Sequence, residues 1–156
     1  MREMEVLGVR VSIPENEVVA VLSVREESRV VLPIVIGPRE GASIATAQAG
    51  ITPERPQTHD LFINVMSVMG VQLTEVHITR LEAGTFYAEL VLSTGEHVDA
   101  RPSDAIALAL RSRCPVLCEE EVLSTAGVVM DAEDEADVVA DFQQFLENVE
   151  PEDFEP

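Results

Sequence analysis

The sequence predicts an α+β domain with a largely antiparallel sheet and helices packed on it. Three observations support this prediction. Segments that alternate apolar and polar residues come first, joined by short turns, and two helix patterns follow them. A second group of alternating segments then leads into a third helix pattern. Runs of strands followed by runs of helices are typical of this fold class, and no glycine-rich phosphate loop of the dinucleotide-binding or Walker type is present.

The first three predicted strands cover residues 4–13, 15–25 and 29–37. Turn residues separate them, first "PEN" and then the polar "EES". Links this short predict an antiparallel meander. Pro33 lies inside the third strand, where it indicates a bulge or an edge position because proline cannot donate a hydrogen bond to the ladder.

Residues 38–50 and 58–70 predict two helices. The first begins with Pro38 and ends at Gly50, and its small residues would let it pack very close to a sheet. The second has Thr58 as its expected N-cap. Its apolar residues recur at helical spacing and form the face that we expect to pack: Leu61, Phe62, Val65, Met66, Val68 and Met69.

The second half of the chain predicts a hairpin, a helix and two short elements. Residues 71–81 and 85–94 alternate around the turn "EAG", and residues 95–101 extend this hairpin. A helix over 102–111, a short strand over 115–118 and a brief helix over 119–127 complete the predicted domain, 1–125. Residues 126–136 predict an acidic linker, and 135–149 carry apolar residues at helical spacing. We therefore expect a separate C-terminal segment, 126–156, with an amphipathic helix.

The charge distribution limits the possible functions. The formal net charge is -19, every base is Arg, and the segment from residue 119 onward contains acids but no base. A nucleic-acid site normally needs a basic face, so any such site here must be local or must use metal ions. The N-terminal segment lacks the apolar stretch of a signal peptide, and no apolar run could span a bilayer. We expect a cytoplasmic protein without a membrane partner.

We expect the thiols of Cys114 and Cys118 to be buried and reduced. If "CPVLC" forms a strand, the two residues lie about 13 Å apart, which is too far for a disulfide. A zinc site would need about four ligands, and no second cysteine pair exists.

The first polar constellation is "QTHDLF", at the start of the second predicted helix. Capping explains Thr58, and the helix dipole explains Asp60. Neither explains His59, since the dipole disfavours a charged imidazole there. A neutral imidazole could bind a metal ion or a proton, so a structural and a functional interpretation both stay open.

The second constellation is "HVDARPSD", where a strand leads into the helix over 102–111. On a strand, Asp99 and Arg101 point to one face with His97. In one interpretation Ser103 and Asp104 cap the helix and Arg101 pairs with Asp99 or Asp104. In the other, Asp99 and Asp104 hold Mg²⁺ or Mn²⁺ and Arg101 meets a phosphate. Weaker candidates are Glu40 and Glu89, and His77 is expected to face solvent.

Several motifs occur together in an order that resembles the bifunctional nuclease domain family. They are "LPIVIGPREGASIA", "RPQTHDLF", "GTFYAELVL", "VDARPSDAIALALR" and "PVLCEEEVL", and the resemblance covers about residues 4–125. It implies an α+β fold, a homo-oligomer, with a dimer expected, and nuclease activity on both DNA and RNA. The positions that match its most characteristic polar motifs are Thr58, His59, Asp60, Asp99, Arg101, Ser103 and Asp104, and Glu40 matches the acidic residue after the "IG" turn.

Two functions in different classes follow. One is a nuclease in which a divalent ion, Mg²⁺ or Mn²⁺, assists phosphodiester hydrolysis. Its candidate catalytic residues are His59, Asp60, Asp99, Arg101 and Asp104, and its candidate metal ligands are Asp60, Asp99 and Asp104. The other is a non-enzymatic oligomeric module that binds a ligand or regulates a partner. The net charge favours the second function, and the resemblance favours the first.

Overall fold

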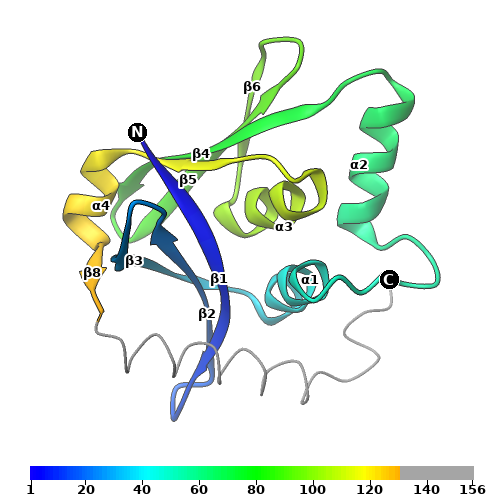
Figure 1. The fold of residues 1–156 in the computed structure, drawn as a ribbon. Coiled ribbons are helices and arrows are strands. Elements are labelled where there is room, and N and C mark those ends of the chain that lie inside the picture. Colours follow the sequence, from blue (N-terminus) through cyan, green and yellow to red (C-terminus); the bar gives the residue numbers. More distant parts are fainter. Residues whose placement is uncertain (131–156) are drawn as a thin grey trace.

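The computed structural model describes residues 1–130, which form a mixed sheet of eight strands and four helices (Figure 1). The strand order is β6-β5-β4-β7-β1-β2-β3-β8, and every pair is antiparallel except β4–β7. Helices and strands alternate in groups along the chain, so the predicted α+β class is confirmed.

The N-terminal half of the sheet is the predicted meander of β1 (Arg2–Ser12), β2 (Glu17–Val24) and β3 (Glu27–Ile36). Alternate residues of β2 and β3 enter the main core, among them Leu22 and Leu32. Pro33 lies on an open stretch of β3, because β8 (Val128–Val129) pairs only with Val30 and Val31. The missing N–H of Pro33 therefore costs no ladder bond, and the predicted edge position is confirmed.

The other half of the sheet is the predicted hairpin of β4 (Leu73–Glu82) and β5 (Thr85–Leu92), extended by β6 (His97–Ala100). Strand β7 (Val116–Cys118) lies between the two halves. It pairs antiparallel with β1 and parallel with β4, so three residues connect both halves into one sheet.

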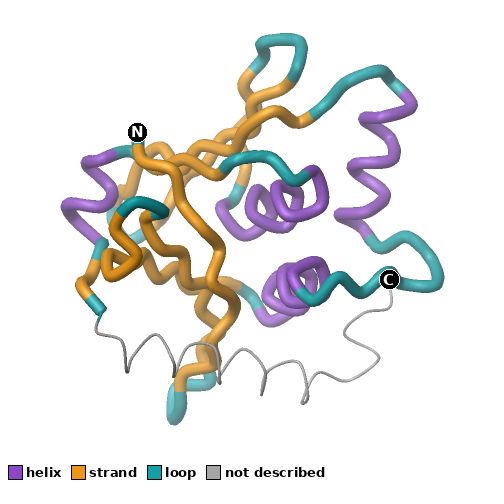
Figure 2. Tube along the Cα trace, viewed as in Figure 1, coloured by secondary structure: helices purple, strands orange, loops and turns teal. Residues whose placement is uncertain are grey.

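Helices α1 (Pro38–Gln48) and α3 (Pro102–Ser112) lie side by side over one face of the sheet, and α2 (Thr58–Val68) lies outside them (Figures 1 and 2). The buried Gly41, Ala42 and Ala45 bring α1 close to its neighbours, as its composition predicted. At the opposite end, α4 (Glu120–Ala126) adds Val122 to the core.

Helix α2 differs from the prediction in its packed face and in its cap. It has no fully buried residue, and Ile63 and Met66 are its residues that pack against the core. Ile63 lies four residues after His59, and Met66 lies three residues after Ile63, so all three lie on one face of α2. This face meets α1 and α3. The N-cap is Gln57 rather than Thr58. Five residues of the predicted apolar face are exposed instead: Leu61, Phe62, Val65, Val68 and Met69.

The end of the described chain also differs from the prediction. The expected linker begins with β8, which extends the sheet beside β3, so residues up to 130 belong to the domain. The predicted helix over 135–149 lies outside the described residues. Cys114 and Cys118 are free thiols; Cys118 is buried as expected, whereas Cys114 is only partly buried. No helix within residues 1–130 has the length and apolar character needed to cross a membrane.

Candidate functional site

The centre of the candidate site is His59, in the first turn of α2. Its Nδ1 lies 2.6 Å from Ser43 Oγ of α1, and its Nε2 lies 2.9 Å from Asp104 Oδ1 of α3. The imidazole thus connects three helices, and its side chain is only 14% exposed. The inner face of α2 directs it there, since His59 lies one helical turn before Ile63.

The hydrogen bonds define the roles of the two ring nitrogens. An ionised carboxylate only accepts, so Nε2 carries the hydrogen that it donates to Asp104. In the neutral ring Nδ1 then accepts the Ser43 hydroxyl hydrogen. Ser43, His59 and Asp104 therefore form a continuous path along which a proton can move between a hydroxyl and an imidazole held by a carboxylate.

Arg101 connects this path to the surface. Its Nε donates to Asp104 Oδ2 at 2.8 Å, and its NH2 lies 3.1 Å from Glu40 Oε1 in the first turn of α1. Burial by itself raises the pKa of Asp104, but the hydrogen bonds and charges of Arg101 and His59 outweigh it and hold this pKa below its usual value. The hydrogen bond and charge of Asp104, followed by those of Glu40, raise the pKa of Arg101. The Arg101 side chain is 64% exposed, so it can also contact a solute.

Asp60 is close to this cluster in sequence, but its carboxylate has a structural role. One oxygen accepts from Arg111 Nε at 2.8 Å, and the other accepts from the Gln57 N–H at 3.0 Å in a capping box. Arg111 also donates to the Ser43 carbonyl at 3.2 Å and to the Ala107 carbonyl at 2.9 Å. The Asp60–Arg111 pair therefore fixes α2 against α1 and α3 and so positions His59.

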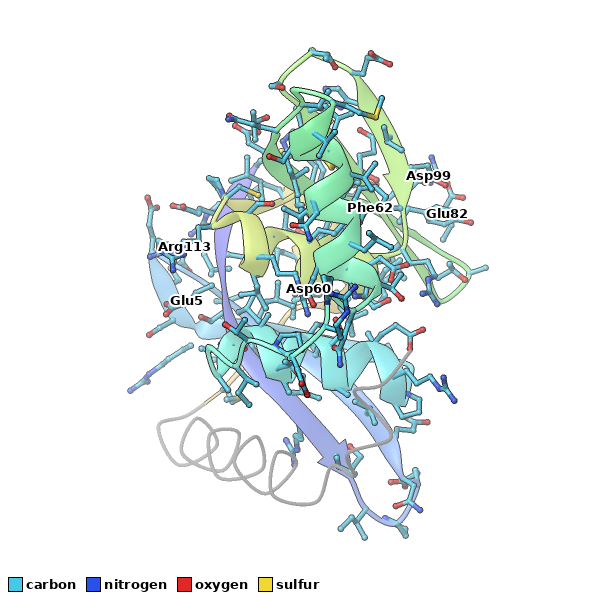
Figure 3. The ribbon with its side chains drawn as sticks, turned by 90° about the vertical axis from the view of Figure 1, so that its right-hand side faces the viewer. Glu5, Asp60, Phe62, Glu82, Asp99 and Arg113 are labelled. Atoms are coloured by element: carbon cyan, nitrogen blue, oxygen red, sulfur yellow. The ribbon has the colours of Figure 1, made fainter. Side chains whose placement is uncertain are left out.

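Asp99 is not part of this cluster. It lies on β6 opposite Glu89 of β5, and Figure 3 shows it on the outer side of the sheet, apart from Asp60. Val76 and Leu90 of the neighbouring strands point into the core beneath α3, so the alternating His77 and Glu89 point to the opposite face. The sequence interpretation placed Asp99 beside Asp104, but the chain turns at Pro102 between the strand and the helix.

The outer face has its own pairs of histidine and glutamate. His97 Nδ1 lies 2.9 Å from Glu89 Oε2, and His77 Nε2 lies 2.6 Å from Glu75 Oε2. The two rings meet edge to face at 5.8 Å. His77 is largely covered by these neighbours, so the expectation that it faces solvent is wrong.

The predicted metal ligands do not gather into one site. Asp60 accepts from Arg111 and Gln57, Asp104 accepts from His59 and Arg101, and Asp99 lies on the other face. Across residues 1–130, no group of three or more His, Cys, Asp or Glu side chains could hold a metal ion. The side chains as they lie do not fit a divalent cation.

Two contributors to the site were not predicted from the sequence. Ser43 lies in the run of small residues of α1, and its contact with His59 spans 16 positions, so no local motif indicates it. Arg111 lies in the last turn of α3, where a base is common at a helix end. In one of the two interpretations of the second constellation, Ser103 and Asp104 cap α3 and Arg101 pairs with Asp99 or Asp104. The Arg101–Asp104 pair is present, but the N-cap is Arg101, with no side-chain cap hydrogen bond.

The fold and the site define an α+β domain in which the first turns of α2 and α3 and the adjacent α1 carry a polar cluster around one histidine. A model described as "Bifunctional nuclease domain" matches residues 20–131, and the chain belongs to this family. An uncharacterized protein of Mycobacterium tuberculosis (strain ATCC 25618 / H37Rv) is 43% identical over 162 residues, which cover 99% of this chain and 98% of that protein.

Plant relatives are more distant. "Bifunctional nuclease 1" of Oryza sativa subsp. japonica is 27% identical over 156 residues, which cover 95% of this chain and 46% of the plant protein. "Bifunctional nuclease 2" of the same subspecies is 26% identical over 125 residues, which cover 75% of this chain and 38% of that protein. The chain therefore spans less than half the length of these plant proteins.

Proposed function

We propose that this protein is a nuclease that hydrolyses phosphodiester bonds in DNA and RNA at the cluster around His59. Its membership of the bifunctional nuclease domain family supports the reaction class. The single observation that carries the proposal is the position of His59, between a serine hydroxyl and an ionised carboxylate, beside an exposed arginine. Proton transfer and stabilisation of phosphate charge are the two tasks that phosphodiester hydrolysis sets.

Each side chain has a role in this proposal. Because both ring nitrogens of His59 are occupied, an attacking water passes its proton to Ser43 Oγ while the Ser43 hydroxyl proton moves to His59 Nδ1. The bond between phosphorus and the leaving oxygen breaks at the same time, and that oxygen takes up a proton from a second water. Asp104 orients the imidazole and stabilises its charged form. Arg101 faces the phosphate and offsets the negative charge that develops on its oxygens. Asp60 acts through Arg111 as a positioning residue, and Ser43 holds the second ring nitrogen.

The net charge of -19 opposes binding of a polyanion, so the substrate must approach through local contacts. Divalent-ion assistance by Mg²⁺ or Mn²⁺ remains a prediction of the family resemblance, and the ligands named for it do not converge. The assay for cleavage therefore includes Mg²⁺, Mn²⁺ and EDTA as separate conditions. Activity that persists in EDTA would indicate chemistry carried by the side chains alone.

The decisive experiment is a cleavage assay with end-labelled single-stranded DNA and RNA on the purified protein, His59→Ala and Asp104→Asn. We expect a loss of about 10²-fold or more in each variant, the usual contribution of a general acid or base. His97→Ala is the matched control, because it removes another histidine from a carboxylate pair on the opposite face. Its activity should stay within about three-fold of wild type. Equal residual activity in all four proteins would indicate a contaminating enzyme and refute the proposal.

The alternative is an oligomeric binding module without catalysis, and the acidic surface favours it. In that case the cluster around His59 holds three helices together, the module binds a ligand or regulates a partner, and none of the four proteins cuts the labelled strands.

We further propose that the protein acts in the cytoplasm as a homodimer. The free thiols of Cys114 and Cys118 support a reducing compartment. The exposed apolar face of α2, formed by Leu61, Phe62, Val65, Val68 and Met69, supports the dimer. No charged residue occurs from 61 to 74 in a chain of high negative charge. A second copy can therefore approach this face without repulsion between like charges.

A further inference from the structure

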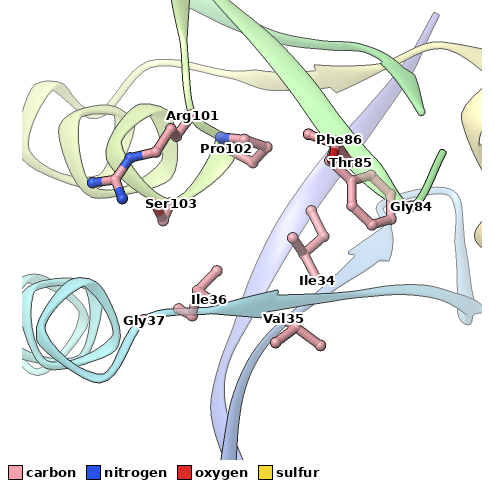
Figure 4. A pocket seen from close by; sticks show the side chains of 10 residues that line it. All are labelled: Ile34, Val35, Ile36, Gly37, Gly84, Thr85, Phe86, Arg101, Pro102 and Ser103. Carbon is pink, nitrogen blue, oxygen red and sulfur yellow. The ribbon is translucent and has the colours of Figure 1, made fainter. Parts of the chain in front are cut away.

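A cavity of about 320 Å³ opens next to the candidate site, between the end of β3, the turn from β4 to β5 and the start of α3 (Figure 4). Ile34 and Phe86 form an apolar part of its wall, and Arg101 and Ser103 form a polar part on the α3 side. Arg101 therefore belongs both to the lining of the cavity and to the hydrogen-bonded cluster around His59.

Ser103 is the unusual member of this lining. The residue is 5% exposed, and its hydroxyl forms none of the side-chain hydrogen bonds found within residues 1–130. The oxygen is not among the fully buried polar atoms without a partner, so it opens to the cavity that it lines. A hydroxyl that lines a cavity in an otherwise covered residue, and that is not bonded within the fold, offers a position for a polar ligand atom. The hydroxyl can donate to an anion, because its hydrogen is not used elsewhere.

The start of α3 adds further donors at the same wall. Arg101 is the N-cap, but its side chain makes no capping hydrogen bond. The first N–H groups of α3 therefore have no side-chain acceptor, and the positive end of the helix dipole faces the same region. Together with Ser103 and the Arg101 guanidinium, these groups match a phosphate rather than a cation.

The opposite wall of the cavity has a different chemistry. Phe86 and Ile34 present apolar surface, which a bare phosphate would leave in contact with water. An aromatic side chain can stack against any nucleobase, because every base has a π-face. The cavity volume lies at the lower end of the range of about 300–1,000 Å³ for small-molecule sites, which excludes a stacked base pair.

We infer that this cavity binds one unstacked nucleotide of a single strand, with its base against Phe86 and Ile34 and its phosphate at Ser103, Arg101 and the start of α3. This inference rests on the proposed nuclease function and narrows its substrate to single strands and unpaired ends. Arg101 then contacts the phosphate of the bound nucleotide beside the imidazole of His59. Glu40 and Asp104 already hold Arg101, so the phosphate competes with two carboxylates and binding is weak.

Titration of ¹⁵N-labelled protein with 5′-AMP, adenosine and inorganic phosphate, followed by NMR, tests the inference. We expect shifts at residues 34–37, 84–86 and 101–104, and tighter binding of 5′-AMP than of either fragment. Ser103→Ala should weaken 5′-AMP binding about ten-fold or more, the loss of one hydrogen bond to a charged group, without changing adenosine binding. Phe86→Leu should weaken both nucleoside ligands. Ser112→Ala, at the other end of α3, is the matched control and should bind like wild type.

Two results would overturn the inference: no saturable shifts with 5′-AMP in the wild type, or equal 5′-AMP binding by wild type and Ser103→Ala. Because Ser103 has no partner in the fold, its alanine variant should fold normally, and the amide spectrum verifies this directly. The titration reports on the cavity independently of catalysis. Binding of 5′-AMP without cleavage of strands would refute the proposed nuclease and leave the cavity assignment intact. Cleavage without 5′-AMP binding would refute the cavity assignment and leave the proposed nuclease intact.

Discussion

Replacing Arg111 by Met should loosen α2 from the rest of the domain. Met keeps the length and apolar stem of the side chain but removes all of its donors. The guanidinium now bonds to Asp60 Oδ1 at 2.8 Å, to the Ser43 carbonyl at 3.2 Å and to the Ala107 carbonyl at 2.9 Å, while the side chain is only 9% exposed. The first two bonds connect different helices, so their loss affects how the helices pack.

The magnitude follows from these two interhelical bonds. Hydrogen bonds to charged groups contribute about 1.5–3 kcal/mol each, which gives an upper range of about 3–6 kcal/mol. In the variant, the Asp60 carboxylate still accepts a hydrogen bond from the Gln57 N–H, and 24% of its side chain is exposed. Water can therefore replace part of the hydrogen bonding that Asp60 loses with Arg111. We therefore expect a decrease of about 3 kcal/mol in the free energy of unfolding. For a chain of this length, that decrease corresponds to a melting temperature lower by about 6–12 °C.

Urea denaturation followed by circular dichroism measures this decrease. Arg113→Met is the matched control, since Arg113 is exposed, lies just after α3 and makes no ion pair within the described residues. It should stay within about 0.5 kcal/mol of wild type. Asp60→Asn in the Arg111→Met background should recover part of the loss, because an amide is less costly than an unpaired carboxylate. Equal stability of the Arg111 and Arg113 variants would refute the positioning role of Arg111.

Three further predictions concern pH, thiol chemistry and self-association. The pKa of Asp104 is held below its ordinary value of about 3.8, so its contribution is fully present above that pH and is lost as the pH falls. Wild type should be more stable to urea than Asp104→Asn above about pH 4, the two should converge as the pH falls further, and a difference that stays constant down to pH 2.5 would contradict this. Burial raises the pKa of Cys114 to about 11 and that of Cys118 to about 12. A thiol reagent at pH 8 should therefore react about 100-fold more slowly with native than with urea-unfolded protein, and comparable rates would be inconsistent with buried thiols. Val68→Asp, at a side chain that is 88% exposed in one chain, should convert a dimer into a monomer in light scattering, whereas a wild type that is already monomeric would exclude the α2 interface.

The sequence was sufficient where local periodicity determines structure. The meander, the hairpin and the helix starts at Pro38 and Pro102 were all predicted, because alternation and proline position are local signals. The sequence also placed His59 and Asp60 in a first helical turn, which is where the structure has them, although it named Thr58 and not Gln57 as the N-cap.

Contacts between distant segments could not be predicted in this way. Nothing near Ser43 indicates that a histidine 16 positions away will accept its hydroxyl hydrogen. The turn at Pro102 separates Asp99 from Asp104, although they are only five positions apart, because the strand and the helix expose different faces. Periodicity identified the apolar residues of α2 but not their orientation, since His59 and Arg111 determine which face of the helix meets the core.

Strand β7 has a consequence for how the chain folds. Its three residues pair with β1 at the opposite end of the described chain and with β4 on the other side, while both hairpin halves form from local contacts. Closing a long loop costs more chain entropy than closing a hairpin, so the pairing with β1 should form late. Amide hydrogen exchange pulsed during refolding would show it, with protection at β2 and β5 before Val116 and Cys118. The two halves of the sheet are thus joined only when a short strand from late in the described chain has entered between them.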